Sequence, residues 1–424
     1  MQIGDINDSY IGKNVFIRGW VYRHRTSKNI TFVVLRDSSG IIQVTFKHDN
    51  PFFKHAENLS IESSVEIEGI VKKDERAPTG YEVEGKTLKV VHRADVFPIT
   101  KDKSIEFLLD KRHLWLRSRE QNVIMKIKDA VIMVAHEWFH ENGFYFVTPP
   151  IITKNACEGG STLFEMKYFE DIAYLSQSAQ LYLEAIMFNL EKVYSLTPSF
   201  RAEKSRTTRH LAEFWHLEGE EAWVDNEGNM KIQEELVKHI CHKVAELRPN
   251  ELKLLGRDPE DLLRIKTPFP RIEHKKAVKM LLDMGLTPDP SGDFGAKEER
   301  ALTENSKQPL FVVNFPKEAK AFYMKENPND PKTYLCADLL APEGFGEIIG
   351  GSERETDFDK LVERLKKEGA NIKDYEWYLE LRRYGSVPHS GFGLGIERVV
   401  KWICKSEHIR EAQPFPRTLT RCQP

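Results

Sequence analysis

The sequence predicts an α+β protein of two or three domains, in which a small all-β unit precedes a larger unit of alternating strands and helices. Its 424 residues exceed a single typical core of about 150 residues. Hydrophobic residues make up 40% and charged residues 30%, which is typical of a soluble globular chain and excludes global disorder. The numbers of basic and acidic residues are nearly equal, at 62 against 65. The net charge alone therefore gives no sign of a nucleic-acid partner, and any such partner must be inferred from local charge.

The first 96 residues are predicted to form a small barrel of five strands. Runs rich in β-formers occupy residues 15–21, 30–35, 41–46, 64–71 and 86–91. Turns are expected at residues 37–40 and around Gly80 and Gly85. Short strands with glycine-containing turns favour a closed barrel of the OB type, and a small β-sandwich is the competing architecture.

Cations and aromatic rings are interleaved near the start of this barrel, where residues 13–36 contain no acidic residue. On OB folds such a strand face holds single-stranded nucleic acid, because cations follow the phosphates and rings stack on the bases. A solvated surface above core aromatics explains the same pattern. The cations are Lys13, Arg18, Arg23, Arg25, Lys28 and Arg36, and the rings are Phe16, Trp20, Tyr22 and Phe32.

The chain after the barrel is predicted to be a linker and a large mixed domain. Residues 97–103 break the strand pattern. Apolar residues with helical spacing predict a helix at 122–141, and further helices are expected at 232–246 and 357–368. Strands are expected at 193–196, 311–315 and 346–349. We expect the barrel at 1–97, a linker or hinge at 98–118 and the second domain at 119–424.

The five cysteines are widely scattered and form no CxxC pair. This spacing argues against a disulfide framework and a structural zinc site, and it favours a reducing, cytoplasmic location. The longest apolar runs, such as residues 131–135, are too short to span a bilayer, so no membrane partner is expected.

A first motif joins Arg201 and Glu203 to a polar loop at 204–209 and to residues 210–214. Two side chains two positions apart on a strand face the same side, where they can hold a phosphate and a polar base edge. The lysine, serine, arginine and threonine of the loop can close over a polyanion. A lone Arg-x-Glu is usually a surface ion pair, but the full constellation argues against that interpretation.

A second motif is a strand at 391–398 with glycine at alternate positions, followed by Arg398. Bare backbone lets a ligand lie against the strand, and Arg398 can bind a phosphate. A tight turn is the alternative.

Asp338 and Glu347 lie on neighbouring segments, and two carboxylates beside a phosphate site are natural ligands of Mg²⁺. A solvated acidic face is the alternative for this pair.

The chain resembles the class II aminoacyl-tRNA synthetases over nearly its whole length. Its RAE and RHLAEF segments, at 201–203 and 209–214, resemble motif 2 of that family, and GFGLGIER at 391–398 resembles motif 3. The helix at 122–141 with residues 146–149 resembles motif 1, and the barrel resembles the anticodon-binding OB domain of subclass IIb. The pattern is most similar to the asparaginyl and aspartyl members. The resemblance implies a catalytic domain with a mostly antiparallel sheet flanked by helices.

The resemblance implies a site for ATP and Mg²⁺. Arg201 would contact the α-phosphate and the substrate carboxylate, while Phe214 and Arg398 would enclose the adenine. His210 would meet the outer phosphates, and Asp338 and Glu347 would hold the metal. The implied catalytic residues are Arg201, Glu203 and Arg398, and the implied ATP contacts are Arg201, Glu203, Arg209, His210, Leu211, Phe214, Glu347, Ile348, Gly395 and Arg398.

The resemblance also implies a pocket that takes asparagine rather than aspartate. Arg354 would face the side-chain oxygen of either amino acid. Aspartyl members carry a lysine three residues after a glutamine, whereas Leu183 follows Gln180 at that distance. Glu218 stands where asparaginyl members place an acceptor for the amide NH₂, and its charge would repel aspartate. The implied contacts are Glu158, Gln180, Leu183, Glu218, Gly350, Ser352 and Arg354; Glu353 departs from the usual glutamine.

The implied partners are L-asparagine, tRNA(Asn) and a second copy of the chain. Motif 1 builds a homodimer interface in this family, and Pro149 would lie near it. The barrel would bind the anticodon in a salt-dependent manner, with Phe32 and Gln43 on its central uridine. The implied anticodon contacts are Phe32, Gln43, Arg23, Arg25 and Lys28.

Three alternatives remain open from the sequence. An aspartyl enzyme would need a substitute for the lysine that is absent at Leu183. A synthetase-like amide ligase that makes free asparagine would usually lack the barrel. A non-enzymatic RNA-binding protein would not need Arg201, Glu347 and Arg398.

Overall fold

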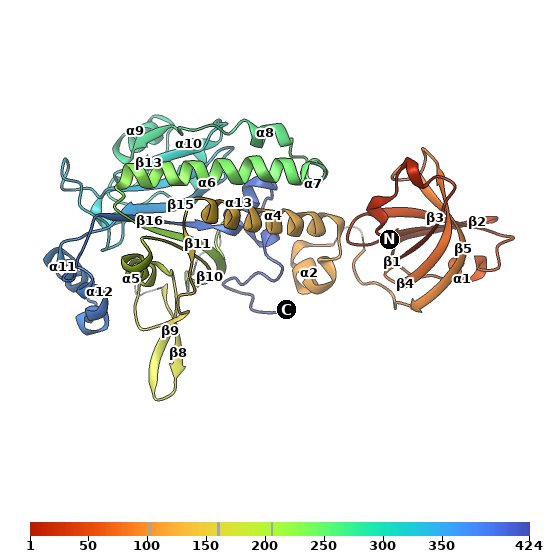
Figure 1. The fold of residues 1–424 in the computed structure, drawn as a ribbon, viewed down its shortest axis with the longest axis horizontal. Coiled ribbons are helices and arrows are strands. Elements are labelled where there is room, and N and C mark those ends of the chain that lie inside the picture. Colours follow the sequence, from red (N-terminus) through yellow and green to blue (C-terminus); the bar gives the residue numbers. More distant parts are fainter. Residues whose placement is uncertain (101–102, 159–161, 205–206) are drawn as a thin grey trace. The chain divides into compact units, whose positions relative to one another are not determined.

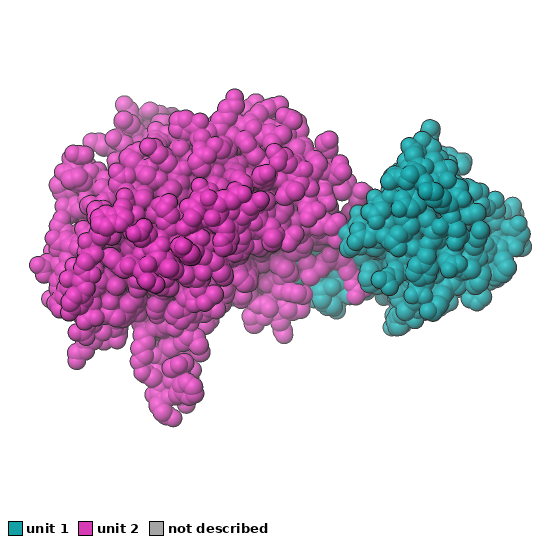
Figure 2. All heavy atoms as spheres, viewed as in Figure 1, with its two compact units in different colours: residues 1–115 teal, residues 116–424 magenta. Residues whose placement is uncertain are grey.

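The computed structural model describes residues 1–100, 103–158, 162–204 and 207–424 (Figure 1). The chain divides into two compact units, Met1–Trp115 and Leu116–Pro424 (Figure 2). In the described ranges, no helix combines the length and the apolar character needed to cross a membrane. The free cysteines of these ranges are buried, except for Cys422.

The first unit is a closed barrel with the strand order β1-β2-β3-β5-β4. This confirms the OB-type prediction over the β-sandwich. Alternate side chains of each strand fill the interior, among them Ile17, Val33 and Val44. The strands are β1 (Asn14–Ser27), β2 (Ile30–Arg36), β3 (Ile41–Lys47), β4 (Ser64–Lys73) and β5 (Tyr81–His92), with the short helix α1 (Phe53–Glu57) between β3 and β4.

Gly85 was expected in a turn, and that expectation is wrong. It lies inside β5, opposite Gly69 of β4, next to a shift in the pairing register. A Cβ at Gly85 would come within 2.5 Å of the Phe46 ring. Glycine is therefore required here because a buried ring crowds the strand, and sequence alone does not separate this case from a turn.

The second unit is built on an eight-stranded sheet with the order β12-β13-β14-β15-β16-β11-β10-β6. Neighbouring strands are antiparallel except β12–β13 and β10–β6, as expected for a mostly antiparallel sheet. The strands are β6 (Tyr145–Phe146), β10 (Lys192–Phe200), β11 (Glu213–Ala222), β12 (Arg271–Glu273), β13 (Leu310–Val313), β14 (Cys336–Ala341), β15 (Gly346–Glu353) and β16 (His389–Gly395). A separate three-stranded sheet contains β7 (Ile152–Thr153), β8 (Phe164–Tyr168) and β9 (Asp171–Leu175).

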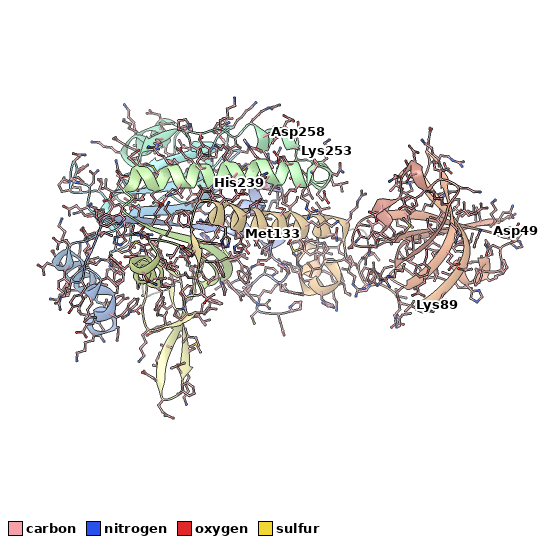
Figure 3. All side chains as sticks on the ribbon, viewed as in Figure 1. Asp49, Lys89, Met133, His239, Lys253 and Asp258 are labelled. Atoms are coloured by element: carbon pink, nitrogen blue, oxygen red, sulfur yellow. The ribbon has the colours of Figure 1, made fainter. Side chains whose placement is uncertain are left out.

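The three helices expected from apolar spacing are present, and two of them begin earlier than the apolar pattern does. Ser118 accepts a hydrogen bond from the Gln121 N–H and starts α4 (Arg119–Glu141). Asp225 caps α6 (Asn226–Leu247), whose first turn is polar. Met133 on the outer side of α4 is exposed (Figure 3). The other helices are α2 (Ile105–Asp110), α3 (Arg112–Trp115), α5 (Gln180–Leu190), α7 (Pro249–Leu254), α8 (Pro259–Leu263), α9 (His274–Asp283), α10 (Ala296–Thr303), α11 (Phe358–Lys367), α12 (Glu376–Glu380) and α13 (Ile396–Ile403).

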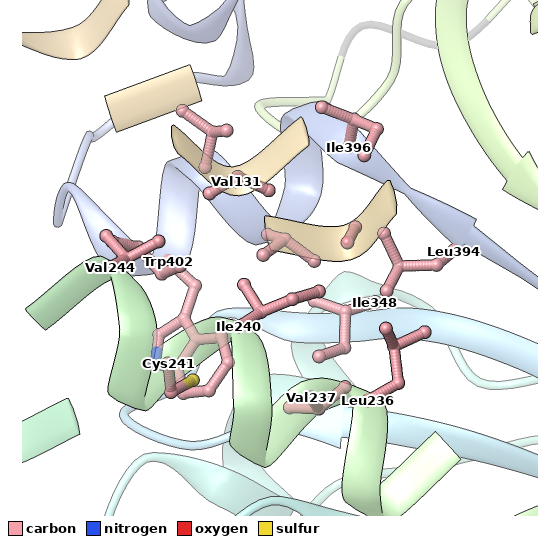
Figure 4. Packing of buried hydrophobic residues seen from close by; sticks show 14 of the residues in the cluster. Val131, Leu236, Val237, Ile240, Cys241, Val244, Ile348, Leu394, Ile396 and Trp402 are labelled. Atoms are coloured by element: carbon pink, nitrogen blue, oxygen red, sulfur yellow. The ribbon is translucent and has the colours of Figure 1, made fainter. Parts of the chain in front are cut away.

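The main core lies between the sheet and the helices α4, α6 and α13. Val131, Ile240 and Trp402 of these helices form one cluster with Ile348 and Leu394 of β15 and β16 (Figure 4). Successive residues of a strand point to opposite faces. The residues of β11, β15 and β16 between the core positions therefore project from the other face of the sheet, where the polar side chains gather.

Candidate active site

A cavity of about 220 Å³ lies on this polar face. On β11, Leu217 faces the core, while His216, Glu218 and Glu220 line the cavity. The lining includes most of the residues that the sequence predicted for the site: Glu158, Gln180, Arg201, Glu203, Arg209, His210, Leu211, Phe214, Glu218, Asp338, Glu347, Ile348, Gly350, Arg354, Gly395 and Arg398.

Two of the predicted substrate contacts, Leu183 and Ser352, do not line the cavity. Leu183 is fully buried in an apolar cluster with Met187 and Val193, because its position on α5 faces β10. The Ser352 hydroxyl accepts a hydrogen bond of 2.7 Å from Nη1 of Arg354. Ser352 is thus placed to orient Arg354 rather than to contact a ligand.

Arg201 stands at one end of the cavity without a carboxylate partner among the described residues. It directly follows β10, and its guanidinium lies 5.6 Å from the centre of the Phe214 ring on β11. Its Nε is buried and lacks a hydrogen-bond acceptor. A half-buried guanidinium that no described carboxylate holds is a strong anion site.

Two carboxylates converge beside this cation. Glu347 accepts from Arg398 through Oε2 at 2.8 Å, and Asp338 accepts from Lys320 through Oδ2 at 2.6 Å. Their other oxygens, Oε1 and Oδ1, lie 3.4 Å and 3.7 Å from the point where a Cβ would sit on Gly350. The missing side chain leaves a space with two carboxylate oxygens, which suits Mg²⁺, an ion that combines few carboxylates with phosphate and water. The described residues contain no group of three or more ligands for a protein-only metal site.

His210 is a neutral residue in this setting. Burial, aided by Arg398 and Arg209, lowers the pKa of His210 to about 4. Its Nδ1 lies 2.6 Å from the Thr207 hydroxyl, and its Nε2 lies 4.0 Å from Glu203. His210 can therefore contact a phosphate as a hydrogen-bond donor without adding positive charge. Residues 205 and 206 of the predicted polar loop lie outside the described residues.

The other end of the cavity holds a buried carboxylate, Glu218. It accepts from the Ser178 hydroxyl and, at 2.8 Å, from the Ala179 N–H. Burial raises the pKa of Glu218 to about 7, although these two hydrogen bonds favour the charged form. A hydrogen-bond acceptor at this position suits an amide NH₂ and disfavours a second carboxylate.

Arg354 also lines the cavity, and its charge is already compensated. Two of its nitrogens, Nε and Nη2, donate to the carboxylate of Glu220, and the pair is almost fully buried. Its guanidinium also lies 5.1 Å from the centre of the Tyr323 ring. A guanidinium held on one edge by a carboxylate presents its remaining N–H groups in a fixed direction.

A buried network behind the pocket fixes Gln180. Its Nε2 donates to Glu184 at 3.0 Å, and Glu184 also accepts from Arg382 and from Tyr378. Burial opposes ionisation of Glu184, but Arg382 and His389 outweigh it and hold the pKa of this carboxyl well below its usual range. Gln180 is therefore held by a permanently charged partner.

Sequence reasoning missed several residues of the cavity and its support. The alternation of His216, Glu218 and Glu220 on one strand was a visible signal, since three polar residues then share a face. Lys320 and Glu184 carried no local signal. The missed residues are Glu184, His216, Glu220, Asp293, Lys320, Tyr323 and Arg382.

The explanation given for the glycine-rich strand is wrong for part of it. A Cβ on Gly391 would lie 2.0 Å from a carboxylate oxygen of Glu220, and one on Gly393 would lie 2.2 Å from the His216 ring. Both glycines make room for side chains of the neighbouring strand, and of the two only Gly393 also lines the cavity. Gly395 has more open surroundings, with Arg398 as its nearest neighbour at 3.4 Å.

A second candidate surface lies on the barrel. Between β1 and β2, Arg25 pairs with Phe32 and Arg23 pairs with Val34. Between β2 and β3, Val34 pairs with Gln43. Paired residues and residues two apart on a strand share a face, so these side chains lie together on the outer face of the barrel. The Arg25 guanidinium lies 4.6 Å from the Phe32 ring. Phe16 and Trp20 of β1 are exposed, which excludes the alternative that these two rings are core residues. Lys28 lies in the turn between β1 and β2.

Replacing Glu218 by glutamine should change the pH dependence of stability. The pKa of Glu218 is about 7 in the folded chain against an ordinary 4.5, so the folded chain keeps a proton that the unfolded chain has released. The free energy of unfolding should fall between these two pH values, by roughly 3 kcal/mol in total, and level off above pH 7. In E218Q the free energy of unfolding, measured with urea at several pH values between 4.5 and 7, should lack this fall. Equal slopes for the two proteins would contradict the assignment.

The comparisons with known proteins agree with this geometry. The family of class II tRNA synthetases (D, K and N) matches residues 104–419, and the OB-fold nucleic acid binding domain matches residues 15–91. An asparagine–tRNA ligase of Thermococcus kodakarensis is 55% identical over 99% of this chain and 98% of its own length.

Solved structures give the same result. Asparaginyl-tRNA synthetase from Pyrococcus horikoshii, complexed with asparaginyl-adenylate, is 51% identical with a TM-score of 0.96, covering 100% of this chain and 99% of its own. An aspartyl-tRNA synthetase from Entamoeba histolytica is 26% identical with a TM-score of 0.86, covering 100% of this chain and 92% of its own. On this likeness and on the match over residues 104–419, the chain belongs to the class II tRNA synthetases of the D, K and N family.

Proposed function

We propose that the chain is an asparagine–tRNA ligase. It activates L-asparagine with ATP, releases pyrophosphate, and transfers the asparaginyl group to the 3′-terminal adenosine of tRNA(Asn). The observation that carries the proposal is the cavity itself, whose lining combines Arg201, which no described carboxylate pairs, with the paired Arg354 and the carboxylate acceptor Glu218. Similarity to asparagine–tRNA ligases over the full length supports it.

Arg201 would stabilise the reacting phosphate. In the first step the carboxylate of asparagine attacks the α-phosphorus and the bond to the pyrophosphate oxygen breaks. Negative charge increases on the α-phosphate oxygens, and the Arg201 guanidinium, which lines the cavity and is held by no described carboxylate, can donate to them. Phe214 would lie against the adenine, with Arg398 reaching the phosphates. The step needs no general base, because the nucleophile is already a carboxylate.

Asp338 and Glu347 would hold Mg²⁺ through the two oxygens that converge over Gly350. The ion would neutralise charge on the phosphates of ATP and on the pyrophosphate that leaves. Glu203 and His210 also line the cavity and would contact the nucleotide. Glu203 would accept hydrogen bonds, and His210 would bind as a neutral ring. Arg209, Leu211, Ile348 and Gly395 complete its lining.

Selection of asparagine over aspartate would depend on Arg354 and Glu218. Arg354 donates to the side-chain oxygen, which both amino acids carry. Glu218 accepts from the amide NH₂ of asparagine, whereas aspartate would place a carboxylate against it. Since Glu220 already neutralises Arg354, this arginine has no spare charge to offer to that second carboxylate.

The α-amino group of the substrate would be held by Glu158 and Gln180. Glu158 accepts from the Tyr323 hydroxyl through Oε1 at 2.8 Å, which fixes its side chain at the cavity wall. Gln180 is fixed by Glu184. An ammonium group needs acceptors in three directions, and these two side chains supply two of them.

The outer face of the barrel would bind the anticodon. Phe32 would stack on a base, Gln43 would hydrogen-bond to it, and Arg23, Arg25 and Lys28 would neutralise the neighbouring phosphates.

We also propose that the enzyme is a cytoplasmic homodimer. Met133 and Phe146, which lie in the segments that resemble motif 1, are exposed apolar side chains, as are the neighbouring Tyr145, Ile151 and Ile152. Pro149 itself is buried within the unit.

Amino-acid-dependent exchange of pyrophosphate into ATP, without tRNA, tests the proposal. The wild-type chain should exchange with asparagine and not with aspartate. R201A should lower kcat/KM for asparagine by about 100- to 1,000-fold, because it removes one donor aimed at the developing charge. R300A, which removes a largely exposed arginine outside the cavity, is the matched control and should leave exchange unchanged.

Other outcomes of the exchange assay favour the rivals. Exchange with aspartate alone would make the chain an aspartyl enzyme. Exchange with neither amino acid would favour an RNA-binding protein without activity. Formation of free asparagine from aspartate would identify an amide ligase.

Replacing Phe32 by alanine should separate tRNA binding from activation. Loss of one stacked base should raise KM for tRNA(Asn) at least about tenfold in aminoacylation, and it should leave the exchange reaction unchanged. V91A, at another exposed apolar position of the barrel, should change neither reaction. An unchanged KM for tRNA in F32A would contradict the assignment of this face to the anticodon.

A further inference from the structure

The phosphate-binding end of the cavity contains more than the expected cations. Of the lysines and arginines that line the cavity in the described ranges, Arg201 lacks an ion pair, and each of the others holds a carboxylate. At this end the pairs are Arg398–Glu347, Lys320–Asp338 and Arg209–Glu299. The cations needed for ATP and the carboxylates needed for Mg²⁺ therefore neutralise one another in the free chain.

Lys320 shows the pattern most clearly. Its Nζ lies 2.6 Å from Oδ2 of Asp338 and 3.0 Å from Oδ2 of Asp293, and its side chain is 9% exposed. It also lies 4.0 Å from the centre of the Phe315 ring. Because the Lys320 ammonium is confined in this way, it can bind a ligand only by exchanging one of its carboxylate acceptors for the ligand.

The three pairs are linked to one another. Glu299 holds Arg209 and also accepts from the backbone N–H of Glu347 at 2.7 Å. Glu347 in turn holds Arg398, and its free Oε1 converges with Oδ1 of Asp338 over Gly350. A cation placed over Gly350 would bind the free oxygens of the two carboxylates whose other oxygens hold Lys320 and Arg398, and it would draw on the same negative charge.

We propose that Lys320 is a third phosphate-binding cation, beside Arg201 and Arg398, and that ATP and Mg²⁺ bind by exchanging partners with the pairs Lys320–Asp338 and Arg398–Glu347. Mg²⁺ held by Oε1 of Glu347 and Oδ1 of Asp338 would neutralise these carboxylates and weaken their hold on the ammonium and the guanidinium, which then turn to the phosphates. Neither ligand alone completes the exchange, since metal-free ATP leaves carboxylates facing phosphates and the metal alone leaves buried cations unpaired. Binding of each ligand therefore strengthens binding of the other. This inference rests on the proposed function and adds to it the role of Lys320 and the rearrangement of the two ion pairs.

The first test is calorimetric titration of the full chain with ATP in the absence of asparagine, with either Mg²⁺ or a chelator present. E347Q removes the charge that holds Arg398. Its affinity for metal-free ATP should rise about tenfold, the effect of one charge-assisted hydrogen bond made available, while the gain from Mg²⁺ should shrink. E355Q is the matched control, because Glu355 is a buried carboxylate that holds Arg364 at 2.9 Å outside the cavity. It should leave both affinities unchanged.

The second test uses Mn²⁺ alone, observed by its electron paramagnetic resonance signal. K320M removes the ammonium that occupies Asp338, and it should bind Mn²⁺ about tenfold more tightly than the wild type in the absence of ATP. K325M is the matched control, since Lys325 holds Glu353 at 2.5 Å and does not line the cavity. Circular dichroism and thermal unfolding of each variant verify that it is folded.

The outcomes separate this inference from the proposed function. Opposite changes for metal-free and Mg²⁺-bound ATP in E347Q, with tighter Mn²⁺ binding in K320M, would support the exchange of partners. Metal-free ATP binding that is unchanged or weaker in E347Q would overturn it, and an equal rise in E355Q would assign the effect to net charge and overturn it too. In either case asparagine-dependent exchange by the wild type would leave the ligase assignment intact. A wild type without ATP binding or exchange would contradict that assignment instead.

Discussion

Charge that is buried beside a β-sheet must be paired, and this constraint organises the whole catalytic unit. Removing an ion from water costs several kcal/mol even after relaxation, and a partner with good geometry offsets that cost. The fold meets the requirement with carboxylates on or beside the strands, each aimed at one cation: Glu220 at Arg354, Glu347 at Arg398, Asp338 at Lys320 and Glu184 at Arg382. Arg201 departs from the pattern, and it is the residue we assign to the reacting phosphate.

The sheet can hold these pairs because its two faces are chemically separate. Leu217 of β11 and Leu394 of β16 face the helices. Residues next to them on the same strands, such as Glu218 and Gly393, face the cavity. The antiparallel register sets Glu218 against Gly393 and Glu220 against Gly391. A Cβ on Gly393 or Gly391 would collide with the His216 ring or with Glu220, so glycines of one strand leave space for polar side chains of the next. The same pairing that builds the core therefore sets the positions of the groups that recognise substrate.

Alternation and helical spacing predicted the barrel and the long helices, because both patterns are visible along the chain. Most of the cavity lining was predicted from the resemblance of contiguous motifs to the class II synthetases. Partners distant in sequence could not be predicted this way. Glu184 and Arg382 are 198 residues apart, and Glu220 and Arg354 are 134 apart, so no window of sequence contains either pair. Glu353 was an unexplained departure from the family pattern; its carboxylate binds Lys325 and the Asn226 N–H on the other face of β15, away from the cavity.

The central claim is that a carboxylate acceptor facing an already neutralised arginine makes the pocket select an amide. The most direct measurement is the ratio of kcat/KM for asparagine to that for aspartate in pyrophosphate exchange, compared between the wild type and E218Q. The account predicts that the ratio falls at least about 100-fold in E218Q, because the repulsion of aspartate is removed and one acceptor for the amide is lost. An equal ratio in the two proteins would contradict the account and assign selectivity to another part of the pocket.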